Sequence, residues 1–372
     1  MNSDLITLAA DLVRLDSRSA LSNLAVAERI EAELGDFEIE RLDYIDPAGV
    51  PKRALVAHRG PLLGGAPGGG GMALSGHMDT VPATGWQDDP WSGRVADGKL
   101  YGLGSTDMKG PVAACVLAAR GLPAHIPVTL LITADEETSK QGAREIVLHS
   151  ELVRRARPTA IVIAEPTSLI PVRGHRSAIG FTITATGIQA HSSTGVGRNA
   201  NWALAPFLMD MRGIHERLRN DPALHDAAYD PIFSDFNLVL DNFGAPVNMT
   251  VPKAEARIKF RYSFGINPAP IVAAVRDAAL LHGLDLNIAA EGPPPELPAD
   301  HPLIRLCTDM VGKPARTAPY GTDAAELQAI APCVILGPGD VGVAHTPREN
   351  VSIEELQRAV EVFSLLLQTY RQ

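Results

Sequence analysis

Two short motifs hold the side chains best suited to chemistry. Residues 75–82 read Ser-Gly-His-Met-Asp-Thr-Val-Pro, and they place His77 and Asp79 at the end of an apolar run. Residues 102–110 read Gly-Leu-Gly-Ser-Thr-Asp-Met-Lys-Gly, with Asp107 at the start of a predicted helix. Imidazole nitrogens and carboxylate oxygens are ligands that hydrolytic metal ions such as zinc accept. The two motifs therefore indicate a metal or anion site.

Further acidic and histidine side chains follow other apolar runs. Glu136 and Glu137 come after one predicted strand, Glu165 comes after the next, and His345 lies near the C-terminus. Strands that alternate with helices predict a mostly parallel sheet, and ligands bind beyond the carboxyl ends of such strands. The repeated occurrence of these side chains at strand ends favours one shared site.

The ligand types suggest how two metal ions could be held. A pair of zinc ions needs a bridging anionic ligand, and Asp107 is the candidate bridge. His77 and Glu165 would complete the protein ligands of one ion, and Glu137 and His345 those of the other. Taken singly, these residues have ordinary alternatives, such as a helix N-cap for Asp107 or a solvated loop for the adjacent glutamates.

Asp79 and Glu136 have predicted roles beside the metals. Asp79 would accept the proton of the second ring nitrogen of His77 and so fix its tautomer. Adjacent carboxylates on an extended segment point in different directions, so Glu137 could bind metal while Glu136 faces the substrate. Glu136 would then be the general base that takes a proton from metal-activated water and passes it to the leaving amine.

Composition narrows the class of protein. The chain has 372 residues and a net charge of −10, from 33 basic and 43 acidic side chains, which argues against a nucleic-acid-binding surface. No stretch approaches the roughly 18 apolar residues of a membrane span. The N-terminal residues have no secretory pattern, and the three cysteines, in apolar runs, are expected to be buried free thiols. A cytoplasmic enzyme is the prediction.

The order of predicted elements indicates an α/β protein with an inserted domain. Residues 1–172 and 293–372 should form a catalytic metal-binding domain with a mixed, mostly parallel sheet flanked by helices. Residues 173–292 follow a β-α-β-β-α-β order, which is typical of a small α+β sandwich. One helix is predicted over 143–155, and the glycine-rich segment 64–71 is predicted as a loop.

The motifs resemble those of the zinc-dependent family that includes acetylornithine deacetylase, succinyl-diaminopimelate desuccinylase, aminoacylase and glutamate carboxypeptidase. The resemblance covers nearly the whole chain and rests on residues 75–82, 102–110, 135–137, 165–167 and 344–345. It implies two zinc ions per subunit, with Co²⁺ or Mn²⁺ as possible substitutes, and the residue roles assigned above. It also implies a cis peptide bond after Asp107 and a homodimer formed through the inserted domain.

The same resemblance implies residues that act on the substrate. His191, in the segment Gly-Ile-Gln-Ala-His-Ser-Ser, matches a histidine that donates a hydrogen bond to the tetrahedral oxyanion, often in the partner subunit. Asn248 matches a substrate-binding asparagine in a turn of the family, and Arg261 matches an arginine that helps to hold the substrate's carboxylate. Gly321 and Thr322 match positions that supply further hydrogen bonds to that group. Arg261 could equally be a strand-face arginine in a salt bridge.

The segments 336–340 and 344–347 resemble the acetylornithine deacetylase branch most. The expected reaction is the hydrolysis of an N-acyl-L-amino acid, with N-acetyl-L-ornithine first, by a hydroxide held between the zinc ions. Desuccinylation of succinyl-diaminopimelate, deacetylation of acetylcitrulline, and dipeptidase or carboxypeptidase activity are alternatives on the same site. A protein that binds amino-acid derivatives without catalysis is a remote alternative, because no catalytic position is missing.

Overall fold

The computed structural model describes residues 2–62 and 70–370, which leaves most of the predicted loop 64–71 outside the described residues. The chain divides into two compact units. The first contains Met1–Gly174, Pro295–Arg316 and Thr322–Gln372, and the second contains His175–Pro294 and Thr317–Gly321. Residues 317–321 thus belong to the second unit, although they lie after the segment 173–292 that was predicted as the insert. Within this unit, the backbone N–H of Arg176 donates to the carbonyl of Ala318 at 3.3 Å.

Within the described residues, the first unit is built on an eight-stranded mixed sheet with a parallel centre. Strands β6, β3, β7 and β14 run parallel to one another, whereas β2 pairs antiparallel with β1 and β6, and β8 pairs antiparallel with β14. The order of the strands is β1 (Glu38–Ile45), β2 (Pro51–Arg59), β6 (Val128–Thr133), β3 (Met72–His77), β7 (Ala160–Ile163), β14 (Cys333–Ile335), β8 (Val172–His175) and β13 (Arg316–Ala318). A small antiparallel sheet, which the sequence did not predict, joins β15 (Asn350–Ser352), β5 (Lys99–Tyr101) and β4 (Arg94–Ala96).

Helices flank this sheet, as predicted for the α/β class. Helix α3 (Lys109–Arg120) is the most enclosed, with every residue from Lys109 to Ala119 buried. The strand residue Gly76 allows β3 and this helix to pack closely, because a Cβ at that position would come within 2.7 Å of the side chain of Val112. The remaining helices are α1 (Asn2–Arg14), α2 (Leu24–Glu31), α4 (Gln141–His149), α5 (Glu151–Ala156), α8 (Pro302–Val311), α9 (Ala324–Leu327) and α10 (Ile353–Thr369).

The helix predicted over 143–155 is wrong in one respect, because the chain forms two helices there. Ser150 lies between them with an extended backbone, and its side chain accepts a hydrogen bond from the N–H of Val153 at 3.0 Å. It also donates to the carboxylate of Glu40. Serine competes for backbone hydrogen bonds and favours helix starts over helix interiors.

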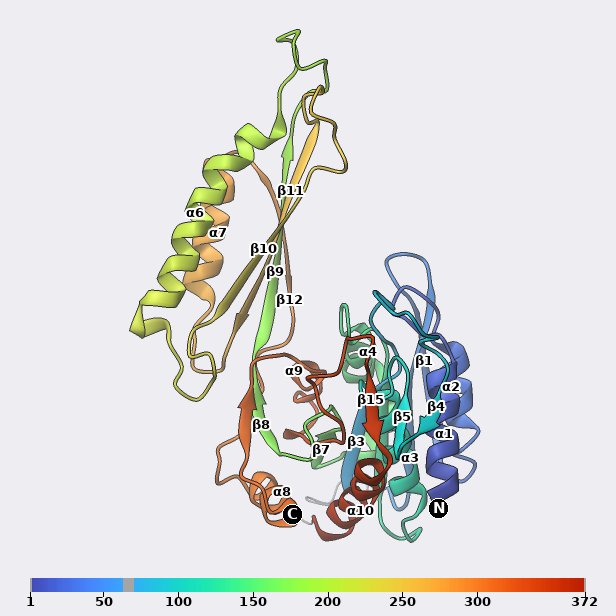
Figure 1. Cartoon of the computed structure of the whole chain (residues 1–372). Helices are drawn as coiled ribbons and strands as arrows, with labels where there is room; N and C mark the ends of the chain where they lie inside the picture. The colour runs from blue at the N-terminus through green and yellow to red at the C-terminus, as the bar shows by residue number, and fades with distance from the viewer. Residues whose placement is uncertain (1, 63–69, 371–372) are drawn as a thin grey trace. The chain divides into compact units, whose positions relative to one another are not determined.

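The second unit has the predicted β-α-β-β-α-β order. The order along the chain is β9 (Ser177–Thr186), α6 (Ala200–Asn220), the 3₁₀ turn η1 (Pro222–Leu224), β10 (Asp235–Asp241), β11 (Lys253–Tyr262), α7 (Ala269–Leu281) and β12 (Asp285–Ala290). The strands form an antiparallel sheet in the order β10-β11-β9-β12, and α6 and α7 lie side by side along it (Figure 1).

The three cysteines are buried free thiols, as predicted. None of the helices in the described part of the chain has the length and apolar character needed to cross a membrane.

Replacing Ser150 by alanine should lower the free energy of unfolding by about 1–2 kcal/mol, since this is the typical cost of losing a helix N-cap. The measurement is urea unfolding followed by far-UV circular dichroism. Ser3→Ala is the matched control, because Ser3 is exposed and bonds its neighbour Asp4, and its effect should stay within about 0.5 kcal/mol. Equal effects of the two substitutions would contradict the capping role of Ser150.

Candidate metal centre

Parallel pairing brings three of the predicted site segments to one edge of the sheet. His77, the last residue of β3, is in register with Thr133 at the end of β6, and Ser75 is in register with Ile163 at the end of β7. Glu136 and Glu165 follow those two strands within a few residues. The carboxyl ends of parallel strands meet at one edge, so the side chains that sequence places far apart become neighbours.

The Asp107 carboxylate lies between two imidazoles. Its Oδ1 is 3.1 Å from Nε2 of His77, and its Oδ2 is 3.1 Å from Nε2 of His345. The peptide bond that follows Asp107 is cis, as the family resemblance implied. Each carboxylate oxygen thus faces a different imidazole nitrogen, which is the arrangement that a bridging carboxylate requires.

Glu137 and Glu165 complete the cluster from opposite sides. Glu137 Oε1 is 2.9 Å from Nε2 of His345, and Glu165 Oε1 is 3.9 Å from Nε2 of His77. Two groups of three residues could each hold a metal ion: His77, Glu136 and Glu165, and His77, Asp107 and Glu137. Within each group, the ligand atoms lie within 4.8 Å of one another. Such nitrogen and oxygen donors fit zinc or a similar divalent ion.

The charges of the cluster also fit cations. Burial, followed by the negative charge of Asp107, raises the pKa of Glu137 to about 7 and raises that of Glu165 well above its usual value. Hydrogen bonds to Asp107 and Glu137 raise the pKa of His345 to about 11. Burial opposes ionisation of Asp107, yet hydrogen bonds from His345 and His77 hold its pKa below the usual value. The buried carboxylates therefore repel one another when ionised, and divalent ions would supply the positive charge that offsets this repulsion.

Asp79 lies beside His77, and its carboxylate makes further contacts that the sequence did not predict. The Nδ1 nitrogen of His77 is 2.9 Å from the backbone carbonyl oxygen of Asp79 and 3.5 Å from its carboxylate. The carboxylate accepts the backbone N–H groups of Glu136 and Glu137 at 3.1 and 3.2 Å, and the hydroxyl of Ser19 at 2.8 Å. Asp79 therefore fixes both the imidazole and the turn that carries the two glutamates.

Glu136 is buried beside the cluster and pairs with a lysine that sequence reasoning missed. The ammonium of Lys140 lies 2.8 Å from Oε1 of Glu136. Lys140 stands in the polar run after Glu137 and carries no motif signal, so only the fold reveals the pair.

Glu349 is a second residue that sequence reasoning missed. Its Oε1 accepts the backbone N–H groups of Thr106 and Asp107, both at 3.0 Å, and so holds the segment of the bridging residue. Burial, with the charge of Asp107, raises the pKa of Glu349 to about 8. Its spacing of four residues from His345 is the only signal the sequence offered.

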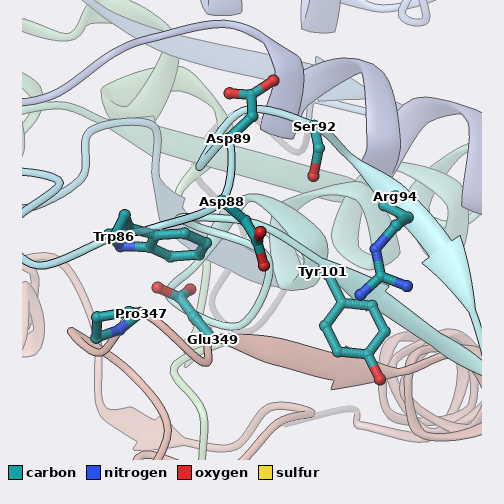
Figure 2. A pocket seen from close by; sticks show the side chains of 8 residues that line it. All are labelled: Trp86, Asp88, Asp89, Ser92, Arg94, Tyr101, Pro347 and Glu349. Carbon is teal, nitrogen blue, oxygen red and sulfur yellow. The ribbon is translucent and has the colours of Figure 1, made fainter.

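Glu349 also lines a pocket of about 310 Å³ (Figure 2). The view shows the carboxylates of Glu349 and Asp88 next to the ring of Trp86, with the guanidinium of Arg94 over the ring of Tyr101. Glu349 therefore connects this pocket, through its hydrogen bonds, with the segment that carries Asp107.

The second unit brings two of its predicted residues together. The N–H of Ser192, next to His191, donates to the carbonyl of Asn248 at 3.0 Å, and His191 forms a β-bridge with Met249. The Nδ1 nitrogen of His191 accepts the backbone N–H of Ser193 at 3.3 Å. A neutral imidazole that accepts at Nδ1 carries its proton on Nε2, so the exposed ring presents a donor.

The other predicted substrate residues have different surroundings. Arg261 forms an ion pair with Asp235 at 2.8 Å, across the β10–β11 register, which is the alternative that the sequence left open. Gly321 belongs to the second unit, and Thr322 to the first. The hydroxyl of Thr322 is buried and accepts the N–H of Ala324 at 3.1 Å.

The sequence matches the model of the peptidase family M20/M25/M40 over residues 73–369, and the chain belongs to this family of hydrolases. It is 31% identical to the acetylornithine deacetylase of Yersinia pseudotuberculosis over 377 residues, which cover 98% of this chain and 94% of the relative. The family and the enzyme class agree with the resemblance drawn from the motifs.

Solved structures share the fold at low sequence identity. An M20 family metallo-carboxypeptidase from Sulfolobus solfataricus superposes with a TM-score of 0.73 at 15% identity, covering 98% of both chains. The YXEP protein of Bacillus subtilis, described as a dinuclear metal-binding peptidase from the M20 family, gives a TM-score of 0.62 at 16% identity, covering 98% of this chain and 97% of that one.

Metal uptake by the metal-free protein should release protons and become tighter as pH rises from 6 to 8. Glu137, with a pKa near 7, and His345, with a pKa near 11, hold protons in this range and must lose them to ligate. Affinity should rise roughly tenfold per pH unit for each proton released. Calorimetry of Zn²⁺ binding in buffers of different ionisation enthalpy measures the release, and an affinity independent of pH would contradict this account.

Proposed function

We propose that this chain is a two-metal amidohydrolase that removes the acyl group from an N-acyl-L-amino acid, with N-acetyl-L-ornithine as the first candidate. The observation that carries the proposal is the Asp107 carboxylate, whose two oxygens face the imidazoles of His77 and His345. Glu165 and Glu137 extend the two halves of this cluster.

Two Zn²⁺ ions per subunit are proposed as the cofactors, with Co²⁺ or Mn²⁺ as substitutes. His77, Asp107 and Glu165 would hold one ion, and Asp107, Glu137 and His345 the other. The description of the Bacillus subtilis neighbour as a dinuclear metal-binding peptidase supports this proposal. When bound, such ions polarise the scissile carbonyl and lower the pKa of water to near 7.

Glu136 is proposed as the general base. Glu136 is buried beside the cluster, and its backbone N–H donates to the carboxylate of Asp79 at 3.1 Å. It would take a proton from the attacking water and deliver it to the nitrogen of the leaving amine. Asp79 would support this step by holding the turn of residues 136–137 in place.

His191 is proposed to donate a hydrogen bond from Nε2 to the oxyanion of the tetrahedral intermediate, in its own or a partner subunit's site. The contact of its Nδ1 with Ser193 supports the required tautomer. Arg261, Gly321 and Thr322 are proposed to bind the substrate's carboxylate, and Asn248 is proposed as a further substrate-binding residue. Arg261 would have to exchange its contact with Asp235 for this.

A homodimer through the inserted unit is also proposed. Exposed apolar side chains on α6 and the edge strand β10 support it, since such patches are typical of interfaces: Trp202 is 79% exposed and Leu240 53%. We also propose a cytoplasmic location and a role in arginine biosynthesis. Both proposals depend on N-acetyl-L-ornithine being the substrate.

Amine release by Zn²⁺-reconstituted protein tests the substrate. The panel is N-acetyl-L-ornithine, N-acetyl-L-citrulline, N-succinyl-diaminopimelate and a dipeptide, with the metal-free protein as control. We expect N-acetyl-L-ornithine to be preferred, with kcat/KM of about 10⁴ M⁻¹s⁻¹ or more. Preference for another member would replace the substrate, and no hydrolysis of any member would reject the proposed function.

The two adjacent glutamates should respond differently to substitution. Glu136→Gln should retain both metals and lower kcat by about 10²–10⁴, the usual contribution of a general base. Glu137→Gln should lose bound metal, measured by atomic absorption after dialysis. Glu354→Gln, at an exposed position on α10, is the control and should change neither quantity. Metal loss in Glu136→Gln with normal content in Glu137→Gln would exchange the two roles.

A further inference from the structure

We propose that Lys140 is the positioning residue of the general base: its ammonium holds the Glu136 carboxylate off the metals and in place to accept a proton. The inference rests on the proposed function. Lys140 Nζ lies 2.8 Å from Oε1 of Glu136, and both residues are almost fully buried, at 6% and 7% exposure. A hydrogen bond to Oε1 restricts the rotation of the carboxylate, and so limits the positions open to Oε2.

The backbone conformation at Lys140 places its side chain next to the carboxylate of Glu136. Lys140 precedes α4 with a φ of +57°, in the left-handed region that residues other than glycine rarely adopt. Its N–H donates to the carbonyl of Asp135 at 2.7 Å, so the turn after β6 closes on itself. The strained residue and the glutamate that it contacts therefore belong to one rigid turn. Strained backbone that surrounding structure maintains is common at functional sites.

The charges around the pair favour this arrangement. A buried ammonium needs an anionic partner, because an isolated buried charge is costly. Asp323, buried and hydrogen-bonded by Thr133, interacts electrostatically with both Glu136 and Lys140. Lys140 therefore lies among acidic side chains, and its ammonium is at hydrogen-bond distance from Glu136.

The same contact distinguishes the base from the ligands. Glu136 comes close enough to His77 and Glu165 to share an ion with them. An ammonium at 2.8 Å from Oε1 competes with a divalent ion for that carboxylate, whereas Glu137 is paired with the imidazole of His345. Removing the ammonium should therefore free Glu136 to turn toward the metals.

The test compares Lys140→Met with Lys140→Arg, which keeps the charge, and with Lys99→Met, the same change at an exposed site. In Co²⁺-loaded protein, Lys140→Met should change the visible absorption bands, because Glu136 joins the coordination. Adding Glu136→Gln should abolish that change. Unaltered bands in Lys140→Met would overturn the proposal, and this readout does not depend on which substrate the enzyme hydrolyses.

Kinetics on the best substrate of the panel give the second readout. Lys140→Met should lower kcat roughly 10–100-fold, part of a general base's contribution, with KM changed less than about twofold. Lys140→Arg should recover part of kcat. In the Glu136→Gln background, Lys140→Met should cause no further loss, because the two residues act as one unit. A full additional loss in the double variant would show a merely structural ion pair and overturn the proposal.

Discussion

Like charges repel strongly where water is excluded, and the first unit is organised around this constraint. Asp107, Glu136 and Glu165 are buried close together at one edge of the sheet. Two imidazoles, those of His77 and His345, provide part of the compensating charge. The remaining imbalance is expressed in the raised pKa values of Glu137 and Glu165, and divalent cations are the groups that would remove it.

The acids stay in place because neighbouring groups hold them individually. Asp79 accepts the backbone N–H groups of Glu136 and Glu137, and Glu349 accepts those of Thr106 and Asp107. Hydrogen bonds from N–H groups to carboxylates are strong because the acceptor is charged. Two buried carboxylates outside the proposed ligand set thus orient the segments that carry the ligands and the proposed base.

Several features could be predicted from sequence because they depend on local pattern. Apolar runs followed by polar residues located β3, β6 and β7 and the acids beyond them, and the β-α-β-β-α-β order of the second unit followed from periodicity. The break at Ser150 was missed because the apolar pattern continues through it, although its side chain caps α5. The role of Asp79 was only partly foreseen, since its carboxylate also accepts backbone N–H groups from the turn that follows β6.

The sequence by itself determined the family, the α/β class and the residue types available for metal binding, because motifs and periodicity are properties of neighbouring residues. Only the tertiary structure decided that each oxygen of Asp107 faces a different imidazole, and that Lys140 contacts Glu136. Such pairings depend on strand register and on turn conformation, which decide where the charged end of each side chain lies. The sequence contains the charges, and the fold sets the distances on which their interaction depends.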